Sequence, residues 1–383
     1  MKGSSGEALS HEPPPQVVFL CGARDFHAMD WYRSAVALIK EPRPMIVTDL
    51  IEAEGFKKLI DSEDIVYNLI VLDKYLFGTQ SRLGHIWRNL LKALVFPIQV
   101  ILLRRFAKKH KNALYYPHAM YYIWLAWAAR VPFVGTPQGS DVLVNPKNSW
   151  IYKTLSTRAM RAAILITVDS EQMSDEVQAL AGKRALVIQN GIDLNAIDSA
   201  MSKTTASSVL REKITSFRGL TPLYRIYEML KARNESSSND KTPISFVYPF
   251  YESEYQTKIK AVLGKNDELL GRLSKHQLYT IFAQTVLSVS IPSSDSSPRS
   301  VYEAIFCGAI VAIAWQPYYE ALPRCMKHRI VLVQLDEPNW FDQALAQAQR
   351  LIEIPFVPSE EALDLFDQFR SFNKLHMRAL QLM

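Results

Sequence analysis

The sequence predicts an α/β protein made of two doubly wound domains. Apolar runs rich in β-branched residues alternate with helical segments along the whole chain, which is typical of parallel sheets covered on both faces. The alternation restarts after Asn190-Gly191, so we expect a second sheet to begin there. With 383 residues, 48% of them hydrophobic, the chain is long enough for two separate cores.

We predict strands at the apolar runs and a domain boundary in the polar stretch between the two sets. The predicted strands are 17–20, 45–47, 65–72, 133–136, 164–168 and 185–188, then 214–217, 245–248, 286–291, 310–314 and 331–334. The serine- and threonine-rich segment 201–208 suits a link, so the first domain covers residues 16–200 and the second covers 201–358. We expect a disordered leader over residues 1–15, which lack the apolar core of a signal peptide, and a final helix over 359–383.

The most informative stretch is 291–314, IPSSDSSPRSVYEAIFCGAIVAIA. It predicts a polar turn after a strand and then a helix that Ser297 caps, with Pro298 at the first helical position and Gly308 just past the end. The backbone N–H groups and the dipole of such a helix start favour a phosphate. The turn from Ser297 to Ser300 is therefore a candidate phosphate site.

Charged side chains around this helix start indicate what else the ligand contains. Arg299 adds a forked cation that suits phosphate. Asp295 and Glu303 stand eight residues apart, one in the turn and one inside the helix. Carboxylates suit hydroxyl groups rather than phosphate, and a nucleotide sugar offers both.

The same segment resembles the E-x7-E signature of family-4 retaining glycosyltransferases of the GT-B fold, with Asp295 in place of the first glutamate. Further fragments resemble the family in the expected order: TPQGSDVL at 136–143, TVDSEQMSDEV at 167–177, VIQNGIDL at 187–194, SFRGL at 216–220 and GRLSKHQLYTIFAQTVLSVSIPSSD at 271–295. The resemblance spans about 114–314. It implies two Rossmann-like domains that face each other across a cleft, an acceptor-side domain followed by a nucleotide-sugar donor domain, with the final helix packed back on the first.

The resemblance also implies roles for residues of the second domain. Glu303 would hold the ribose of the donor nucleotide, and Asp295 would reach hydroxyls of the transferred sugar. Arg218 matches the arginine that grips the donor phosphates. A Leu-Tyr pair stands where such enzymes carry a lysine, so Arg225 is the nearest cation that can replace it. The usual glycine-rich turn after the next strand is replaced by VYPFYESEY.

In the first domain, candidates lie where strands are expected to end, because ligands bind open α/β sheets at the carboxyl ends of the strands. The expected substrate-binding residues are Gly22, Asp25 and His27 after the first strand, and Gln138, Gly139, Ser140 and Asp141 in a later turn. By the resemblance, His118 sits near the reacting sugar and joins Arg218, Asp295 and Glu303 as the catalytic set. For Asp25 and His27 the residue types alone favour a solvated loop.

Charge is distributed unevenly along the chain. No Asp or Glu occurs between Lys74 and Ser140, a span with ten Lys and Arg residues. Its segment 82–112 mixes basic residues with Trp and Leu, and we expect Pro97 to divide it into two helices. Its uncharged run 93–103 is shorter than the ~20 residues that cross a bilayer, so an anionic membrane surface is the expected partner. A core helix with solvated charges stays an open alternative, and no recognised motif indicates nucleic acid.

Neither the cysteines nor the acidic residues are spaced as in disulfide-rich or metal-binding proteins. Cys21, Cys307 and Cys325 show neither a disulfide framework nor the spacing of metal ligands, which suits a cytoplasmic protein. The chain contains no Asp-x-Asp pair, so we expect no bound metal. No cofactor is expected beyond a UDP- or GDP-sugar as co-substrate.

We therefore predict a retaining glycosyltransferase that moves a sugar from a nucleotide diphosphate donor to a glycan or lipid-linked acceptor. It would work in the cytoplasm, peripherally on the inner face of a membrane. Two alternatives stay open: a nucleotide-sugar epimerase of the GT-B fold, and a catalytically degenerate subunit that binds a nucleotide sugar.

Overall fold

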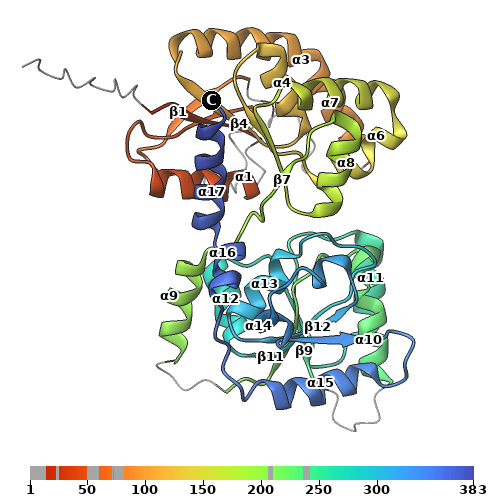
Figure 1. Cartoon of the computed structure of the whole chain (residues 1–383). Helices are drawn as coiled ribbons and strands as arrows, with labels where there is room; N and C mark the ends of the chain where they lie inside the picture. The colour runs from red at the N-terminus through yellow and green to blue at the C-terminus, as the bar shows by residue number, and fades with distance from the viewer. Residues whose placement is uncertain are drawn as a thin grey trace, which may run out of the picture. The chain divides into compact units, whose positions relative to one another are not determined.

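The computed structural model of the chain describes residues 14–22, 26–49, 60–70, 72, 82–205, 210–235 and 242–383. It contains two compact units (Figure 1). Unit 1 comprises the chain up to Ile188 together with Phe372–Met383, and unit 2 comprises Gln189–Ser371. Residues 1–13 of the expected leader, Asp25 and residues 206–208 of the expected link lie outside the described residues.

Unit 1 is built on parallel strands. Four of them form a sheet in the order β3-β2-β1-β4: β1 (Gln16–Leu20), β2 (Met45–Thr48), β3 (Ile65–Asn68) and β4 (Ala113–Pro117). Strands β5 (Val134–Gly135), β6 (Leu165–Val168) and β7 (Leu186–Val187) form a second ladder. The parallel bridge between Tyr115 and Phe133 joins β4 to the start of this ladder. Strand β4 was not among the predicted strands, because its short run ALYYP ends on a proline that ordinarily argues against a central strand.

Helices cover both faces of the sheet in unit 1. Along β1, Val17 and Phe19 face the core that contains α1 (Phe26–Leu38) and the part of α17 (Gln368–Gln381) that belongs to this unit. Val18 and Leu20 face the opposite core. The second core is built with α3 (Arg82–Lys109), α4 (Met120–Ala129), α7 (Trp150–Ala162) and α8 (Glu171–Ala181). Alternate residues of β1 therefore pack against helices on opposite faces of the sheet.

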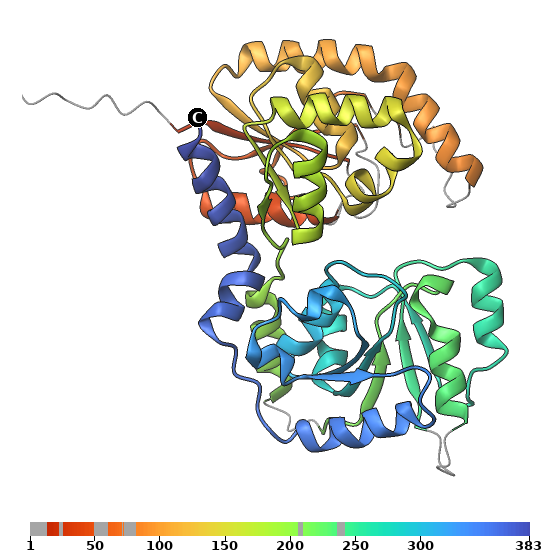
Figure 2. The same ribbon diagram turned by 45° about the vertical axis from the view of Figure 1, so that its right-hand side comes forward.

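Helix α3 is one continuous helix of 28 residues with Pro97 inside it, so the expected division into two helices is wrong. A proline removes one N–H donor and crowds the preceding turn, which bends a helix more often than it ends one this long. Figure 2 shows α3 as one bent ribbon. Phe96 and Leu103, on either side of the proline, both pack on the same core and hold the two halves in line.

None of the helices in the described part of the chain is long and apolar enough to cross a membrane.

Unit 2 contains a six-stranded parallel sheet in the order β10-β9-β8-β11-β12-β13. The strands are β8 (Lys213–Ser216), β9 (Ile244–Val247), β10 (Glu268–Gly271), β11 (Thr285–Ser290), β12 (Ile310–Ala314) and β13 (Ile330–Val333). All six residues of β11 are buried, as expected for a strand inside a sheet with helices on both faces. The predicted strands of this region agree with five of the six to within one residue at each end. Strand β10 was missed because its four residues, ELLG, carry too little periodicity.

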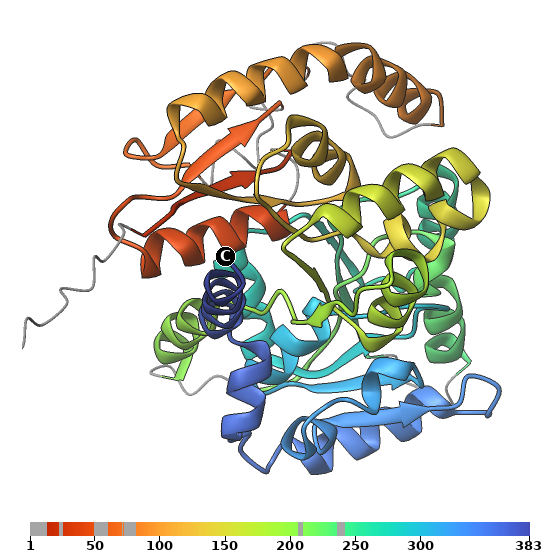
Figure 3. The ribbon, with the colours of Figure 1, turned by 45° about the horizontal axis from the view of Figure 1, so that its top comes forward.

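Helices again lie on both faces of this sheet (Figures 1 and 3). One core contains α10 (Ile226–Asn234), α11 (Ser253–Lys260) and α15 (Trp340–Leu351). The other contains α9 (Leu194–Thr205), α12 (Lys275–Ala283), α13 (Arg299–Phe306), α14 (Arg324–Lys327) and α16 (Glu360–Phe366). Helix α9 therefore belongs to unit 2, whereas the expected boundary at residue 200 would assign half of it to the first domain.

The C-terminal region forms two helices rather than the single helix expected over 359–383. Helices α16 and α17 are separated at Asp367, whose backbone is extended. The break lets this segment pair with the chain near Gly191: the Ile192 N–H donates to the Phe366 carbonyl at 2.7 Å, and the Gln368 N–H donates to the Ile192 carbonyl at 3.1 Å. A Cβ on Gly191 would lie 2.5 Å from the Gln368 Cα, so only glycine permits this approach.

A buried ion pair fixes the outer edge of the sheet in unit 2. Arg233 of α10 donates to both carboxylate oxygens of Asp267, at 2.8 and 2.5 Å, and both side chains are almost fully buried. Burial alone raises the pKa of Asp267, but hydrogen bonds from Arg233 and from the N–H groups of Ile244 and Gly264 outweigh it. These bonds hold the pKa below its ordinary value of 3.8. The pair ties α10 to the β9–β10 edge.

We expect Asp267→Asn to lower the free energy of unfolding by about 3–5 kcal/mol, because it leaves the buried Arg233 without its counter-charge. Since the folded pKa of Asp267 is depressed, its contribution is present at neutral pH and is lost as the pH falls below about 4. Urea unfolding across this pH range measures both effects. Asp336→Asn, at an exposed position, is the matched control and should change stability by less than about 0.5 kcal/mol. Equal stability of the two variants would contradict a stabilising role for the Arg233–Asp267 ion pair.

Candidate active site

The candidate site of unit 2 lies where β8 and β11 end. Arg218 follows β8, Ser290 ends β11, and Asp295 lies in the turn that follows β11. The Arg218 Nη1 lies 3.0 Å from Asp295 Oδ2, and the Arg218 Nε donates to Ser290 Oγ at 2.7 Å. The two charged side chains are 9% and 17% exposed. Strand ends that neighbour in the sheet therefore bring one guanidinium, one carboxylate and one hydroxyl together.

Three polar groups in this region are buried and have no hydrogen-bond partner among the described residues. They are Arg218 Nη2, the Tyr318 hydroxyl and Ser216 Oγ. Burial raises the pKa of Tyr318 well above its usual range; the charge of Arg218 lowers it and that of Asp295 raises it, which places this hydroxyl near the ion pair. Buried polar groups without partners are rare. Donors gathered in this way fit a ligand with several acceptor oxygens, such as a diphosphate.

Aromatic side chains border the arginine. The Arg218 guanidinium carbon lies 5.5 Å from the centroid of the Tyr224 ring, and the Phe250 ring lies 6.2 Å from that of Tyr224. A Cβ on Gly219 would lie 2.3 Å from the Phe250 ring, so glycine allows this ring to rest on the loop after β8. The Leu220 N–H donates to the Phe250 carbonyl at 3.1 Å. The aromatic loop after β9 is thus anchored beside Arg218.

The helix start differs in detail from the prediction. Pro298 is the N-cap residue without a side-chain cap, and α13 begins at Arg299, so the expected capping by Ser297 is wrong. The Ser297 hydroxyl instead donates to the Gln189 side chain, a contact from a distant segment that no local pattern indicates. The N–H groups of Arg299 and Ser300 precede the first helical bond, from the Val301 N–H to the Pro298 carbonyl. These N–H groups remain suited to an anion.

Glu303 is buried and held by two partners. The Tyr279 hydroxyl donates to Glu303 Oε1 at 3.0 Å, and Arg299 Nε lies 3.6 Å from the same oxygen. Burial, and then the charge of Glu303, raise the pKa of Tyr279 well above its usual range, so Tyr279 stays a proton donor. Sequence reasoning missed Tyr279, although it lies within the fragment 271–295 that carries the resemblance. Glu303 and Asp295 thus have separate partners.

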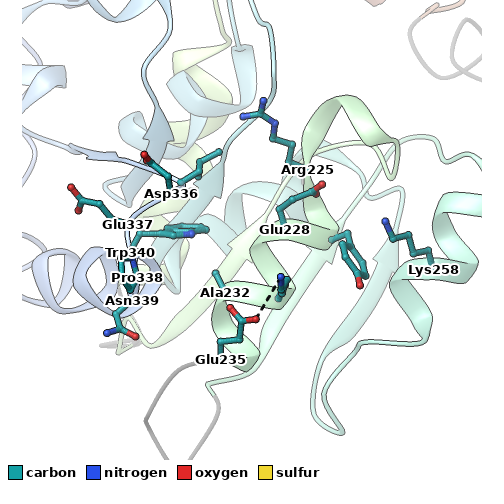
Figure 4. Close-up of a pocket in the computed structure, with 13 residues that line it drawn as sticks. Arg225, Glu228, Ala232, Glu235, Lys258, Asp336, Glu337, Pro338, Asn339 and Trp340 are labelled. Atoms are coloured by element: carbon teal, nitrogen blue, oxygen red, sulfur yellow. Dashed lines mark ion pairs between the residues drawn. The ribbon is translucent and has the colours of Figure 1, made fainter.

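Arg225 occupies a different environment. It is the N-cap of α10, with a left-handed backbone at φ 52°, and lies at the rim of a groove of about 860 Å³ between α10 and the start of α15 (Figure 4). Charges of both signs line this groove, including Glu228, Lys258 and Asp336. None of the contacts described for Arg225 involves the Arg218–Asp295 pair.

In unit 1, the structure places His118 directly after β4 and buries it. Its N–H donates to the Leu20 carbonyl at 3.0 Å, and its ring lies 6.2 Å from that of Trp31. The next residue, Ala119, has φ 73°, a strained value for a residue with a Cβ. Such strain is concentrated at functional sites. Gly22 is buried after β1, and His27 is exposed on α1.

The turn from Gln138 to Asp141 forms the start of α5 (Gly139–Leu143). Asp141 holds the turn in place: Oδ2 accepts from the Met120 N–H at 2.8 Å and Oδ1 accepts from the Tyr152 hydroxyl at 2.8 Å. Gln138 and Ser140 are exposed, and Gly139 has open space around it. The first three residues are therefore accessible to a substrate, whereas Asp141 positions them.

Residues 78–196 match the profile of glycosyltransferase family 4. This part of the chain is similar to glycosyltransferase family 4. The matched residues run from the approach to α3 into α9, so they include His118 and the Gln138–Asp141 turn. The match supports the assignment of the chain as a glycosyltransferase. No curated protein matches the sequence.

The fold is similar to those of several solved proteins. HepE from Anabaena, in complex with UDP, shares 16% identity and a TM-score of 0.66 over 96% of this chain and 100% of its own. Sucrose-phosphate synthase from Thermosynechococcus elongatus shares 14% identity and a TM-score of 0.68 over 96% and 99%. UDP-GlcNAc 2-epimerase from Neisseria meningitidis shares 12% identity and a TM-score of 0.58 over 96% and 99%. At these identities the likeness establishes the fold, which is GT-B with two Rossmann-like domains.

We expect Arg218→Lys to weaken the binding of inorganic pyrophosphate, since lysine keeps the charge but loses the fork that reaches beyond Asp295 and Ser290. One lost charged hydrogen bond corresponds to roughly ten-fold or more in affinity. Isothermal titration calorimetry measures the change. Arg158→Lys, at an exposed position on α7, is the control and should bind like the parent. Unchanged affinity of the Arg218 variant would place the anion elsewhere.

Proposed function

We propose that the chain is a retaining glycosyltransferase that moves a sugar from a nucleotide diphosphate donor to a glycan or lipid-linked acceptor. Its place would be the cytosolic face of a membrane. The observation that carries the proposal is the Arg218–Asp295 pair with the unpartnered Arg218 Nη2 beside it. A buried cation with one free donor suits a diphosphate that gains charge as it leaves.

The donor would be a UDP- or GDP-sugar. HepE, which has a similar fold, has been crystallised with UDP and with UDP and glucose. In this chain the exposed ring of Phe250, beside Tyr224, offers a face for a nucleotide base. A thermal-shift screen over nucleotide sugars identifies the donor, because a ligand that binds only the folded state raises the melting temperature.

The reaction needs charge stabilisation at the leaving group. As the bond between the sugar C1 and the diphosphate oxygen breaks, Arg218 and the N–H groups of Arg299 and Ser300 would meet the developing charge. The acceptor oxygen bonds to C1 on the face that the diphosphate leaves, and its proton passes to a phosphate oxygen. The proposal assigns no nucleophile to the protein. His118 would line the sugar side.

The two carboxylates take different roles in this proposal. Glu303, oriented by Tyr279, would accept hydrogen bonds from the ribose of the donor. Asp295 would reach hydroxyls of the transferred sugar while it neutralises part of the Arg218 charge. Gln138, Gly139 and Ser140 would contact the acceptor, with Gly22 and His27 as further candidates. Arg225 would serve the donor only if its side chain leaves the groove beside α15.

Two other functions remain candidates, each for a specific reason. A nucleotide-sugar epimerase is one, because the Neisseria epimerase has a similar fold. A degenerate subunit that binds a nucleotide sugar is the other, because a Leu-Tyr pair stands where a phosphate-binding lysine is expected. Assays of the donor with and without acceptors separate these functions, since transfer, isomerisation and inert binding give different products.

The first functional prediction separates the carboxylates. Glu303→Gln should weaken donor binding by roughly ten-fold or more through lost ribose contacts, whereas Asp295→Asn should mainly lower kcat. Donor titration and steady-state kinetics measure the two effects. Asp336→Asn in the α10–α15 groove is the control and should leave both quantities unchanged. Parent-like values in both site variants would mean that the site is misplaced.

The second functional prediction concerns metal and stereochemistry. We expect transfer in excess EDTA to proceed as in its absence, because Arg218 and backbone N–H groups supply the positive charge in this proposal. We also expect the product to keep the anomeric configuration of the donor, which proton NMR of the fresh product detects. Complete loss of activity in EDTA with recovery on adding magnesium would refute the charge arrangement. An inverted product would refute the retaining mechanism.

A further inference from the structure

The outward face of α3 carries a stripe of exposed large apolar side chains. They recur every three or four residues and so lie on one side of the helix. The stripe consists of Trp87 (40% exposed), Leu90 (50%), Leu94 (66%), Ile98 (53%) and Ile101 (49%). In Figures 2 and 3 the helix runs along the outside of unit 1. Single exposed apolar residues are common on protein surfaces, but a contiguous stripe over four helical turns is typical of an interaction surface.

This stripe is separate from the face that packs on the core. The inward side of α3 contributes Val100, Leu103 and Phe106, which are buried against strands and α4 of unit 1. The same helix therefore has two apolar faces, one buried in the core and one exposed. A helix that serves only the core of its domain needs one such face.

The stripe continues into a basic end of the helix. Arg105 and Lys108 follow Ile101 at helical spacing on the same side, and Arg104 and Lys109 flank them; all four are exposed. The face from Trp87 to Lys108 is roughly 30 Å long. No acidic residue interrupts it, because the sequence from Lys74 to Ser140 contains none.

A basic pocket of about 400 Å³ opens at this end of α3. The basic side chains that line it are Arg104, Lys108, His110, Lys111 and Arg130, and no acidic side chain is among the lining residues. Tyr115 of β4 also lines it; this side chain is 1% exposed, and its hydroxyl has no hydrogen-bond partner among the described residues. Burial raises the pKa of Tyr115 well above its usual range, so the hydroxyl remains a donor. The pocket thus offers several cations to an anion, and one of its lining residues carries a buried hydroxyl without a described partner.

We infer that the outward face of α3 and this pocket form a docking surface for an anionic phospholipid bilayer. The apolar stripe enters the interface between headgroups and acyl chains, and the pocket holds the phosphate of one lipid headgroup. The inference rests on the proposed function only in assigning the cytosolic leaflet. Docking itself needs neither donor nor acceptor.

Charge complementarity favours a bilayer over a second copy of the chain. A second copy that presents the same acid-free face would bring basic ends and apolar stripe together without any opposite charge. An anionic bilayer supplies apolar depth along the stripe and negative charge at its basic end. A free phosphate would explain the pocket but not the stripe that leads to it.

The test measures binding of the full chain to vesicles in the absence of donor and acceptor. We expect sedimentation with mixed phosphatidylcholine and phosphatidylglycerol vesicles to exceed that with phosphatidylcholine alone by about ten-fold or more, and to fall with salt. Leu94→Gln with Ile98→Gln should abolish it. Ile354→Gln with Val357→Gln, exposed apolar positions of unit 2, is the matched control and should bind like the parent. Vesicles that contain brominated acyl chains should quench the fluorescence of Trp87, so the quenching should decrease in Trp87→Phe.

The pocket is tested separately. Lys111→Gln with Arg130→Gln should lower the preference for anionic vesicles, whereas Lys153→Gln with Arg158→Gln, the same charge change at exposed sites of α7, should lower it much less. Tyr115→Phe should reduce that preference roughly ten-fold while the melting temperature stays equal or rises, because a buried unpartnered hydroxyl is removed. A loss of stability in this variant would contradict the assignment of Tyr115 to a ligand.

Three outcomes would overturn the inference: vesicle binding that the stripe variant retains, a dimer in solution that the stripe variant dissociates, and phosphate binding in the pocket without vesicle binding. The second would identify a copy of the chain as the occupant, and the third a free anion. Transfer to a soluble acceptor should be unchanged in the stripe and pocket variants. A failure of docking is thereby distinguishable from a failure of the proposed transferase activity.

Discussion

The candidate donor site depends on one constraint, the parallel pairing of β8 with β11 in the sheet of unit 2. Parallel strands end at the same edge, so the residues that follow them meet there. Arg218 and Ser290 are 72 positions apart in sequence and yet form a hydrogen bond of 2.7 Å. Asp295 reaches the same arginine from the turn after β11. If this pairing were lost, the separate segments would carry the residues without forming a site.

Burial makes the charge of Arg218 strongly dependent on its partners. A guanidinium loses its hydrogen bonds to water when it is buried, so it needs partners within the protein. Asp295 contacts Nη1 of Arg218 and Ser290 accepts from Nε, whereas Nη2 is left without a partner among the described residues. The remaining donor of Arg218 and the hydroxyls of Tyr318 and Ser216 are buried without hydrogen-bond partners among the described residues. Preorganised donors in a low-dielectric site stabilise developing negative charge without the cost of reorienting water. The same reasoning applies to Glu303, which Tyr279 and Arg299 orient from within the protein.

Helix α3 runs between the two edges of the sheet in unit 1. A helix that joins parallel strands runs antiparallel to them, so the N-terminal part of α3 lies toward the carboxyl edge of the sheet, the edge at which β4 leads into His118. Its C-terminal end lies at the opposite edge, where the pocket beside Tyr115 opens. Docking along this helix, as inferred above, would bring the carboxyl edge of this sheet close to the bilayer.

The sequence by itself determined what depends on local pattern: two doubly wound domains, nearly all strands, and the placement of Asp295 in a turn and Glu303 in a helix. Hydrophobic periodicity and turn residues act over a few positions, so a single sequence is enough to recognise them. Only the tertiary structure decided the rest. Ser297 binds Gln189 instead of capping α13, Asp367 leaves the helical conformation to pair with Ile192, and Tyr279 turns toward Glu303. Each of these contacts joins residues far apart in sequence, and packing, which no local pattern encodes, brings them together.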